Sequence, residues 1–363
     1  MTPPAPRFGV WTSVHGTWAS FHHPDDPVDA SWERNKKVAL LAEDLGYDST
    51  LVAQHTINPL GEDLDQLEAW TACAAFAAIT ERIEIIAAIK PSLFHPVPTA
   101  KMALGIEEIS GGRFAINLVN AWYKPEILRA GLPFIDHDER YAYGAEWLHV
   151  FRSLISGEVT NFHGKYFDVE DYQLIPKSRN RDRLTIYAGG ESPPARDLVA
   201  EQVDSWFVNG QPQEDVKELF EDVDSRPRTL PPLRHGLAAF VIARETEEEA
   251  QAELAYAWEL NRKDEESRRS HNHTMYKHAD QKAQMWQTFK KNPHIGTNGG
   301  TASGLVGSYE HVADVIRQWN ELGVETFMLQ FQPFESEMER FAEKVMPLVK
   351  SGQPAIAGAA EGR

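Results

Sequence analysis

The sequence predicts an α/β protein built as one (β/α)8 (TIM) barrel, and two observations carry this prediction. Eight short apolar runs alternate with longer amphipathic segments, the pattern of parallel strands each followed by a helix. Composition does not shift along the 363 residues and no interior linker separates two halves, so we expect a single domain over residues 1–363. A doubly wound sheet is the alternative, but the first predicted strand lacks the G-x-G-x-x-G turn typical of that fold.

The predicted elements follow in order along the chain. Strands are expected at 8–14, 51–53, 83–89, 114–120, 184–188, 206–209, 237–243 and 327–331, with an added hairpin at 159–174. Helices are expected at 32–45, 64–79, 98–109, 141–155, from 193 onward, and at 213–224, 246–261, 312–322 and 336–348. The run 83–89 is almost wholly apolar, as a strand covered on both faces should be. Gly46 and Gly111-Gly112 are helix-ending signals.

Two further segments fall outside this pattern. Residues 262–300 are polar and too long for an ordinary connection between strands seven and eight, so we expect an insertion that forms a lid over the active-site end. Residues 352–363 are rich in Ala and Gly and are expected to form a flexible tail.

Charge and composition exclude several classes of protein. The chain has 36 Lys and Arg against 54 Asp and Glu, a net charge of −18, which disfavours a nucleic-acid partner. No apolar run reaches about 18 residues, the length that would indicate a membrane span. Residues 1–7 lack the apolar core of a signal peptide. The single cysteine, Cys73, cannot form an internal disulfide. We therefore expect a soluble cytoplasmic enzyme.

Active sites of such barrels lie at the carboxyl ends of the strands, so candidate residues can be read directly from the predicted strand ends. These ends are polar, amide-rich and aromatic, at 12–15, 54–58, 90–91, 117–122 and 189–192. They contain no close carboxylate pair for glycoside hydrolysis, no metal-ligand spacing, and no nucleophile elbow. We expect no metal site.

The segment Gly189-Gly190-Glu191-Ser192 lies between a predicted strand and a helix that begins near Pro193. Two glycines permit close backbone approach, and free N–H groups at the helix start would attract a phosphate. The Ser192 hydroxyl could add one more hydrogen bond. A plain turn at a strand exit remains the alternative interpretation.

Four longer stretches carry a recognisable pattern: ISGGRFAINLVNAWYKPE at 109–126, HDERY at 137–141, YAGGES at 187–192 and GLVGS at 304–308. They resemble the bacterial-luciferase-like flavin monooxygenases, a family that includes alkanesulfonate and pyrimidine monooxygenases. The resemblance extends over nearly the whole chain. The stretch QHTINPLGED at 54–63 is most similar to the dimethyl sulfone monooxygenases of the alkanesulfonate monooxygenase branch.

The resemblance implies a barrel that binds reduced FMN, delivered by a separate NAD(P)H-dependent flavin reductase, and a homo-oligomer such as a dimer or tetramer. By position, the family's FMN contacts fall on Asn117, Glu126, Arg140, Tyr141 and Ser192, beside Gly189 and Gly190. A guanidinium and two hydroxyls suit a phosphate, and an amide suits a flavin ring edge. Structural roles remain open for each: an ion pair for Arg140, packing for Tyr141, helix-terminal charge for Glu126, strand capping for Asn117.

The substrate pocket is expected to be formed by Trp11, His15, Asn120 and Trp122, together with residues of the insertion. His55 is the expected proton donor, base or hydrogen-bond donor to the substrate, with Gln54 beside it. A strand-end histidine bonded to a neighbouring backbone group is the alternative for His55, and core packing is the alternative for the two tryptophans.

One departure from the family pattern bears on the substrate. Alkanesulfonate-cleaving relatives carry an arginine just before the Gly-Gly of the loop after the insertion, where this chain has Asn298, and Phe240 lies near the place of their strand-seven histidine. A neutral sulfone needs no cation at that position. We therefore expect cleavage of the C–S bond of dimethyl sulfone. An alkanesulfonate monooxygenase releasing sulfite, a deazaflavin-dependent oxidoreductase and a non-catalytic flavin-binding protein are the alternatives.

Overall fold

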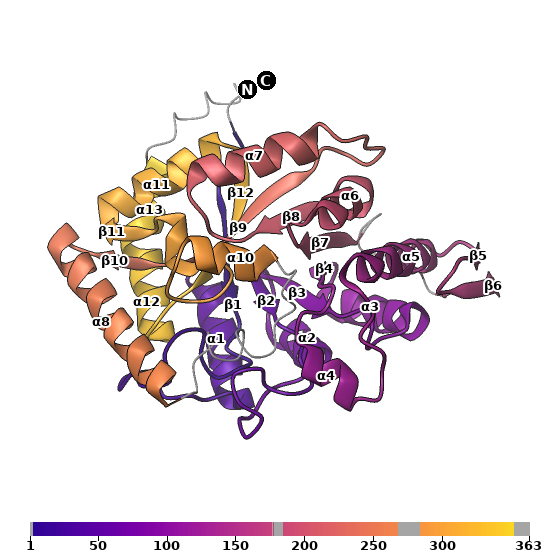
Figure 1. Cartoon of the computed structure of the whole chain (residues 1–363), viewed down its shortest axis with the longest axis horizontal. Helices are drawn as coiled ribbons and strands as arrows, with labels where there is room; N and C mark the ends of the chain where they lie inside the picture. The colour runs from indigo at the N-terminus through magenta and orange to yellow at the C-terminus, as the bar shows by residue number, and fades with distance from the viewer. Residues whose placement is uncertain (1–2, 176, 178–183, 268–283, 352–363) are drawn as a thin grey trace, which may run out of the picture.

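Eight parallel strands close into a barrel in the computed structural model, which describes residues 3–175, 177, 184–267 and 284–351 (Figure 1). Their order around the barrel is β1-β12-β9-β8-β7-β4-β3-β2. The barrel strands are β1 (Arg7–Trp11), β2 (Ser49–Val52), β3 (Glu84–Ile89), β4 (Phe114–Leu118), β7 (Thr185–Gly189), β8 (Ser205–Val208), β9 (Arg234–Phe240) and β12 (Val324–Gln330). The predicted (β/α)8 barrel is thereby confirmed.

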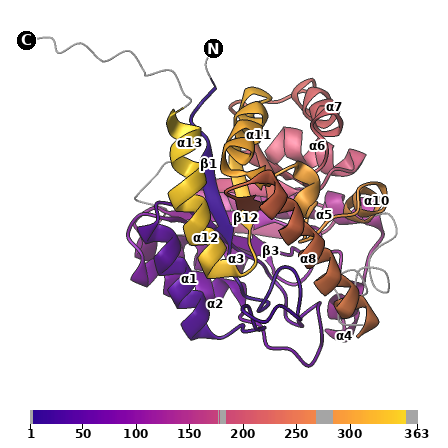
Figure 2. The same cartoon turned by 90° about the vertical axis from the view of Figure 1, so that its left-hand side faces the viewer.

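Helices surround the barrel and fill the connections between its strands. They are α1 (Trp32–Asp44), α2 (Ala69–Ile79), α3 (Pro96–Ser110), α4 (Lys124–Arg129), α5 (His137–Ser156), α6 (Pro193–Gln202), α7 (Gln213–Asp224), α8 (Glu247–Glu266), α10 (Gln284–Lys291), α11 (Tyr309–Glu321), α12 (Phe334–Arg340) and α13 (Met346–Ser351). The C-terminal helices lie against β1 (Figure 2), where the rings of Phe8 and Phe341 are 5.3 Å apart.

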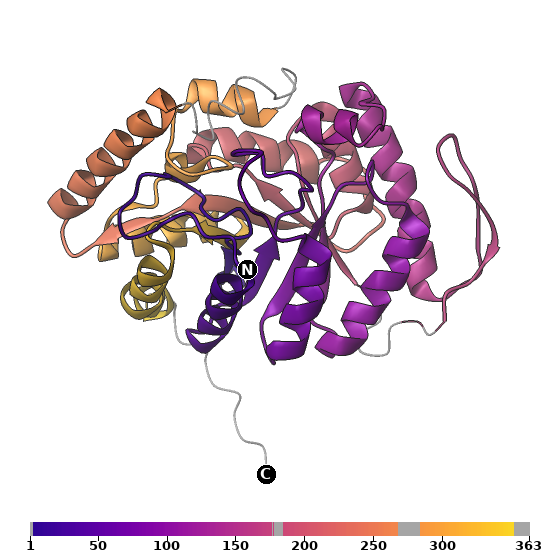
Figure 3. The same ribbon diagram turned by 90° about the horizontal axis from the view of Figure 1, so that it is seen from below.

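Two small sheets lie outside the barrel. The hairpin of β5 (Thr160–His163) and β6 (Asp168–Tyr172) was expected at 159–174, and it projects away from the barrel in Figures 1 and 3. The pair of β10 (Ile242–Arg244) and β11 (Val306–Ser308) was not expected. The sequence predicts one strand over 237–243. In the structure β9 ends at Phe240, and the chain then leaves the barrel and continues as β10, which pairs with β11.

The core consists of two apolar layers separated by the barrel wall. Inside the barrel, one layer contains Tyr187 and Phe207, whose rings stack 5.1 Å apart, with Leu51, Ile86 and Met328 around them. The second and larger layer fills the space between strands and helices. Because both strand faces are covered, the strands carry apolar residues on both sides, which explains the near-continuous apolar runs of the sequence.

Several helix boundaries differ from the prediction. The helix expected from 64 begins at Ala69, because the Glu68 carboxylate caps it through the N–H groups of Trp70 and Thr71. The helix expected at 141 begins one turn earlier, at His137, and α4 was not expected. The helix expected to end at 261 continues to Glu266, so the first residues of the expected insertion are helical.

The rest of the expected insertion is only partly within the described residues. Residues 268–283 lie outside them, as does the expected tail 352–363. Lys291 of α10 bonds to Asp215 in the first turn of α7, which follows β8. This contact places α10 at the end of the barrel where the strands terminate (Figure 3). Among the described residues, no helix has the length and apolar character that crossing a membrane requires.

The Glu43 carboxylate joins α1 to the start of β3. It accepts hydrogen bonds from the backbone N–H groups of Glu81, Arg82 and Ile83, and Glu43 is buried. Burial alone would raise the pKa of the Glu43 carboxyl group. The three N–H donors outweigh burial, so the net effect is a pKa below the ordinary glutamate value. Because the native pKa lies below the unfolded one, this stabilisation is present above the ordinary glutamate pKa and is lost as pH falls through the native value.

Replacement of Glu43 by Gln is expected to lower the free energy of unfolding by about 1–3 kcal/mol at pH 7, because the amide nitrogen that replaces one oxygen turns an N–H toward the Glu81 N–H and the remaining oxygen is a neutral, weaker acceptor. Urea denaturation followed by circular dichroism measures the loss, which should shrink as the pH is lowered below about 4. Glu33→Gln, at an exposed position of the same helix, is the control and should change stability by less than about 0.5 kcal/mol. Equal losses in the two variants would contradict this role of Glu43.

Candidate active site

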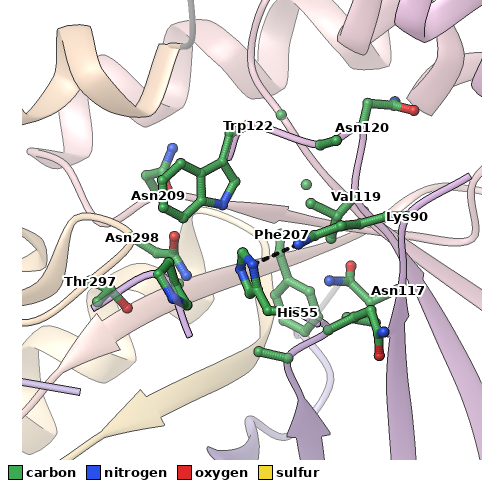
Figure 4. Close-up of a pocket in the computed structure, with 18 of the residues that line it drawn as sticks. His55, Lys90, Asn117, Val119, Asn120, Trp122, Phe207, Asn209, Thr297 and Asn298 are labelled. Carbon is green, nitrogen blue, oxygen red and sulfur yellow. Dashed lines mark hydrogen bonds between the residues drawn. The ribbon is translucent and has the colours of Figure 1, made fainter. Parts of the chain in front are cut away.

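A cavity opens at the carboxyl end of the barrel strands, and it brings together nearly all the residues expected from the sequence (Figure 4). The expected residues that line it are Trp11, His15, Gln54, His55, Asn117, Asn120, Trp122, Arg140, Tyr141, Gly189, Gly190, Ser192 and Asn298. Its other walls include Trp18, Leu60, Phe207 and Ala238, so apolar and aromatic surface surrounds a limited set of polar groups. This is the usual composition of a small-molecule site.

Strand register places His55 beside Lys90 in this cavity. In the pairing of β2 with β3, Ser49 lies opposite Glu84 and Val52 opposite Ala87. The same offset beyond the strand ends aligns His55 with Lys90. The Lys90 Nζ atom lies 2.7 Å from Nδ1 of His55, the contact drawn as a dashed line in Figure 4.

Glu126 does not line the cavity but lies behind Lys90 and His55. Its Oε2 accepts a short hydrogen bond from Lys90 and lies 3.3 Å from Nδ1 of His55, while its Oε1 accepts from the Thr56 N–H and hydroxyl. The family resemblance implies a flavin contact for Glu126. In the structure Glu126 is absent from the cavity lining, and both its carboxylate oxygens accept hydrogen bonds from Thr56 or Lys90.

Burial governs the protonation of these three groups. Burial and the adjacent Lys90 cation lower the pKa of His55 to about 4, although Glu126 acts in the opposite direction. Burial also lowers the pKa of Lys90 to about 8, with Glu126 opposing it. Burial would raise the pKa of Glu126, but His55 and Lys90 outweigh it and lower it to about 2. At neutral pH the group therefore consists of a neutral imidazole beside a lysine–glutamate ion pair.

A cradle of small and hydroxylic groups follows β7. Gly190 adopts φ +107°, and a Cβ there would lie 2.9 Å from the Tyr141 hydroxyl, so glycine permits this close approach. Ser192 is the N-cap of α6, yet its hydroxyl makes no capping bond and is buried without a hydrogen-bond partner among the described residues. A buried hydroxyl left in this state at a helix start is a candidate ligand contact.

The helix start itself offers fewer donors than expected. Pro193 and Pro194 occupy the first two positions of α6, and proline has no N–H. The Arg196 N–H is already bonded to the Ser192 carbonyl. The expected attraction of an anion by free N–H groups of this turn is therefore weaker than the glycine pattern indicated, and the side-chain hydroxyls matter more.

Arg140 and Asn117 occupy other parts of the cavity wall. The Arg140 guanidinium donates to the carbonyls of Asn120 and Ile135 and lies 4.4 Å from the centre of the Phe134 ring. It is thus held in place by the loop that precedes α5 and by the segment that follows β4. Asn117, near the end of β4, has a buried Oδ1 atom without a hydrogen-bond partner in the described part of the chain. An unpartnered buried acceptor is a candidate contact for a ligand.

Trp11 and Gln54 present buried donors that lack partners within the described part of the chain. These are Nε1 of Trp11 and Nε2 of Gln54, whose Oε1 accepts from the Ala69 N–H at 3.3 Å. Aromatic rings surround them: Trp18 lies 5.3 Å from Trp11, and His55 lies 5.3 Å from His15 and 5.7 Å from Trp122. Trp11 and Gln54 therefore offer two hydrogen-bond donors to a small ligand.

Asn298 reaches the cavity from a tightly fastened loop. It adopts φ +51°, a conformation that asparagine tolerates, and its carbonyl accepts from the Gly210 N–H at 2.9 Å. Its neighbour Thr297 exchanges two hydrogen bonds with the buried side chain of Gln330 at the end of β12. This part of the expected lid is fixed to the ends of β8 and β12.

Sequence reasoning gave no role to Lys90, Glu191, Asn209 or Thr297, which also line the cavity, although it placed Lys90 and Glu191 at strand ends. Glu191 is buried, and burial raises its pKa to about 7 although Asn209 and Gln211 oppose this shift. Its carboxylate accepts from the Asn209 N–H and the Gln211 side chain, and so joins the end of β7 to the end of β8. Lys90 and Asn209 directly follow strand ends, a signal that could have identified both.

Among the described residues, no three His, Cys, Asp or Glu side chains are grouped so as to hold a metal.

A (β/α)8 barrel with an aromatic cavity and unpartnered polar atoms at its strand ends defines a class of small-molecule enzyme, and the comparisons identify the family. The model of the luciferase-like monooxygenases matches residues 14–326. The chain belongs to this family and is an oxidoreductase of the monooxygenase type.

Individual relatives extend the similarity over the whole chain. An FMNH2-dependent dimethylsulfone monooxygenase of Pseudomonas putida is 32% identical over 88% of this chain and 89% of its own length. A protein of the same name from Pseudomonas fluorescens (strain Pf0-1) is 29% identical over 96% of each chain. A riboflavin lyase solved with modified FMN and riboflavin has the same fold, with a TM-score of 0.76 and 19% identity over 96% of this chain and 92% of that chain.

Replacement of Gly299 by Ala is expected to detach the Asn298 loop from β8. A Cβ at Gly299 would lie 2.0 Å from O and 2.2 Å from N of Gly210, so the Gly210 N–H could no longer bond to the Asn298 carbonyl. Hydrogen exchange of the Gly210 amide should accelerate about tenfold or more. Gly304→Ala is the matched control, because it has φ +83° but its nearest contact is 3.8 Å away. Equal exchange in both variants would show that the close contact does not hold the loop.

Proposed function

We propose that the cavity binds reduced FMN delivered by a separate NAD(P)H-dependent flavin reductase. Two relatives that cover most of the chain are named as FMNH2-dependent enzymes. The residues fit such a cofactor, because the unpartnered hydroxyl of Ser192 and the unpartnered Oδ1 of Asn117 line one cavity with Tyr141 and Arg140. Ser192, Tyr141 and Arg140 would hold the phosphate beside Gly189 and Gly190, and Asn117 would meet the ring system.

We further propose that the substrate is dimethyl sulfone. The observation that carries this proposal is the pair of unpartnered buried donors, Trp11 Nε1 and Gln54 Nε2, in a largely apolar aromatic cavity. A sulfone is neutral and has two acceptor oxygens between two methyl groups, so its polar and apolar parts both find matching surface. An unmade hydrogen bond to a buried donor is costly, so a ligand that supplies acceptors gains from this arrangement.

The charges around the cavity disfavour an alkanesulfonate, which is the runner-up substrate. Lys90 and Arg140 are the arginine and lysine residues in the cavity lining. Lys90 is paired with Glu126, and Arg140 donates to two backbone carbonyls. Asn298 lies where sulfonate-cleaving relatives carry an arginine. With Arg140 assigned to the FMN phosphate and Lys90 paired with Glu126, a sulfonate entering the cavity would lose its hydration without a further cationic partner among the described lining residues.

The proposed reaction balances with dioxygen as the oxidant. Dimethyl sulfone, dioxygen and reduced FMN give methanesulfinate, formaldehyde, water and oxidised FMN; one oxygen atom enters formaldehyde and the other enters water. The bound flavin supplies the two electrons and activates dioxygen. The protein orients the sulfone through donors of Trp11 and Gln54, excludes water with its aromatic walls, and holds a proton at His55.

The same proposal includes the association of the chain into a homo-oligomer and its cooperation with a flavin reductase. Two other functions fit the fold: a deazaflavin-dependent oxidoreductase, which uses no dioxygen, and a non-catalytic flavin-binding protein, which turns nothing over. The named relatives favour the monooxygenase over both.

Turnover in a coupled assay tests the substrate. The protein is combined with a flavin reductase, NADH and FMN, and offered dimethyl sulfone, methanesulfonate or a pyrimidine under air. We expect formaldehyde and methanesulfinate from dimethyl sulfone, with oxygen uptake in excess of the flavin-only control.

Each other outcome points to one alternative. Sulfite and formaldehyde from methanesulfonate alone would overturn the sulfone assignment. Substrate oxidation that requires an added oxidised deazaflavin and takes up no oxygen would indicate a deazaflavin enzyme, and tight binding of oxidised FMN without any turnover would indicate a flavin-binding protein.

Replacement of Ser192 by Ala tests the flavin site separately. The Ser192 hydroxyl makes no bond in the structure, so its removal should leave stability unchanged but weaken FMN binding by about 1–3 kcal/mol, roughly 5- to 150-fold. Fluorescence titration of anaerobic reduced FMN measures the affinity. Ser205→Ala is the matched control, because Ser205 is also buried without a hydroxyl partner but does not line the cavity. Unchanged affinity in Ser192→Ala would remove this residue from the site.

A further inference from the structure

The wall of the cavity contains a lysine whose ammonium group is almost fully removed from water. The Lys90 side chain is 2% exposed and the Glu126 side chain 0%. An isolated charge at such a position would be very costly, so the arrangement depends on the Lys90–Glu126 contact. The fold brings the two together from the end of β3 and the first turn of α4, a helix that the sequence did not predict.

Hydrogen-bond geometry limits the protonation of His55. Lys90 Nζ lies 2.7 Å from Nδ1 of His55, and an ammonium group can only donate. Nδ1 must therefore be the accepting nitrogen. An imidazolium, or a neutral imidazole with its proton on Nδ1, would point an N–H at the Lys90 ammonium group 2.7 Å away. Two donors would then face each other without an acceptor, which excludes both forms. The remaining form is neutral, with its proton on Nε2.

We propose that Lys90 and Glu126 are positioning residues that fix the tautomer of His55: the Lys90 ammonium, held by Glu126, donates to Nδ1 and keeps the proton of His55 on Nε2. His55 then presents an N–H donor from the cavity wall. This inference rests on the proposed function for the identity of the acceptor, an oxygen of the sulfone, but the tautomer itself does not depend on it.

The surroundings of His55 agree with this assignment. Glu126 is oriented by the N–H and hydroxyl of Thr56, so its Oε2 is left to Lys90. The other titratable groups against the His55 ring are His15, at 5.3 Å between ring centroids, and Tyr123, at 6.0 Å. Burial raises the pKa of Tyr123, so it stays uncharged. The lowered pKa of His55 is the expected consequence of burial together with the adjacent Lys90 cation.

Nitrogen NMR of the full-length, flavin-free protein tests the tautomer directly. The protein is labelled with 15N-histidine, and the His55 signals are assigned by their absence from the spectrum of His55→Gln. We expect a protonated Nε2 and a bare Nδ1, with no change between pH 5.5 and 7.5. A proton on Nδ1, or an imidazolium signal at pH 7, would overturn the proposal without any variant of Lys90.

Variants of Lys90 test its role as the cause. In Lys90→Met the Glu126 carboxylate loses its cation and attracts a proton, so His55 should become cationic or move its proton to Nδ1 at pH 7. Adding Glu126→Gln to this variant supplies an amide N–H donor and removes the negative charge, so the Nε2 proton should return. Lys101→Met, at an exposed lysine of α3, is the control. An unchanged His55 spectrum in Lys90→Met would show that Lys90 does not set the tautomer.

The pH dependence of turnover links the tautomer to activity. With dimethyl sulfone and a flavin reductase, kcat/KM of the native protein should show no ionisation between pH 5.5 and 7.5, whereas Lys90→Met should gain one there and lose at least about tenfold at pH 6. A Lys90→Met profile parallel to the native one would contradict the role in turnover. If the native protein turns over no sulfone, the proposed function fails, while the NMR result still decides the tautomer.

Discussion

Closure of eight parallel strands into one barrel is the constraint on which the site depends. All strands point in the same direction, so their carboxyl ends meet at one rim although they are far apart in sequence. Register then decides which residues become neighbours. The offset that pairs Ser49 with Glu84 also aligns His55 with Lys90, and the offset between β3 and β4 pairs Ala88 with Asn117 inside the same cavity. A slip by one residue would turn these side chains away from the rim.

The strands were predictable because the same closure buries both of their faces. Each barrel strand is an apolar run bounded by polar residues, so periodicity and length located all eight of them. The exceptions have local causes. β10 continues the apolar run of β9, and nothing in the sequence shows that the chain leaves the barrel at Val241 to pair with β11. The helix α4 has six residues and little apolar periodicity, so the pattern was too short to recognise.

The site was predictable to the extent that it depends on strand ends. Residues such as Asn117 and Ser192 were located because they follow a strand or cap the next helix, and both line the cavity. Partnerships across the rim were not predictable. Glu126 carries the charge expected of a ligand contact, but only tertiary structure shows that Lys90 and Thr56 occupy its oxygens. Likewise, the prolines that reduce the donors at the start of α6 were visible, but their effect depends on the exact helix boundary.

The buried ion pair connects the fold to the chemistry that the cavity can accept. A lysine in the wall of a site would ordinarily favour an anionic ligand, because a desolvated cation attracts charge strongly. Glu126 pairs with this cation within the protein, so the two groups together add no net charge to the wall while Lys90 still presents its ammonium group to His55. An anionic substrate would have to compete for Lys90 with the Glu126 carboxylate, which is already in contact with it and already desolvated. A neutral hydrogen-bond acceptor needs only the donors of Trp11 and Gln54. The pairing that makes Lys90 tolerable inside the barrel thereby favours a neutral, oxygen-bearing substrate over a charged one.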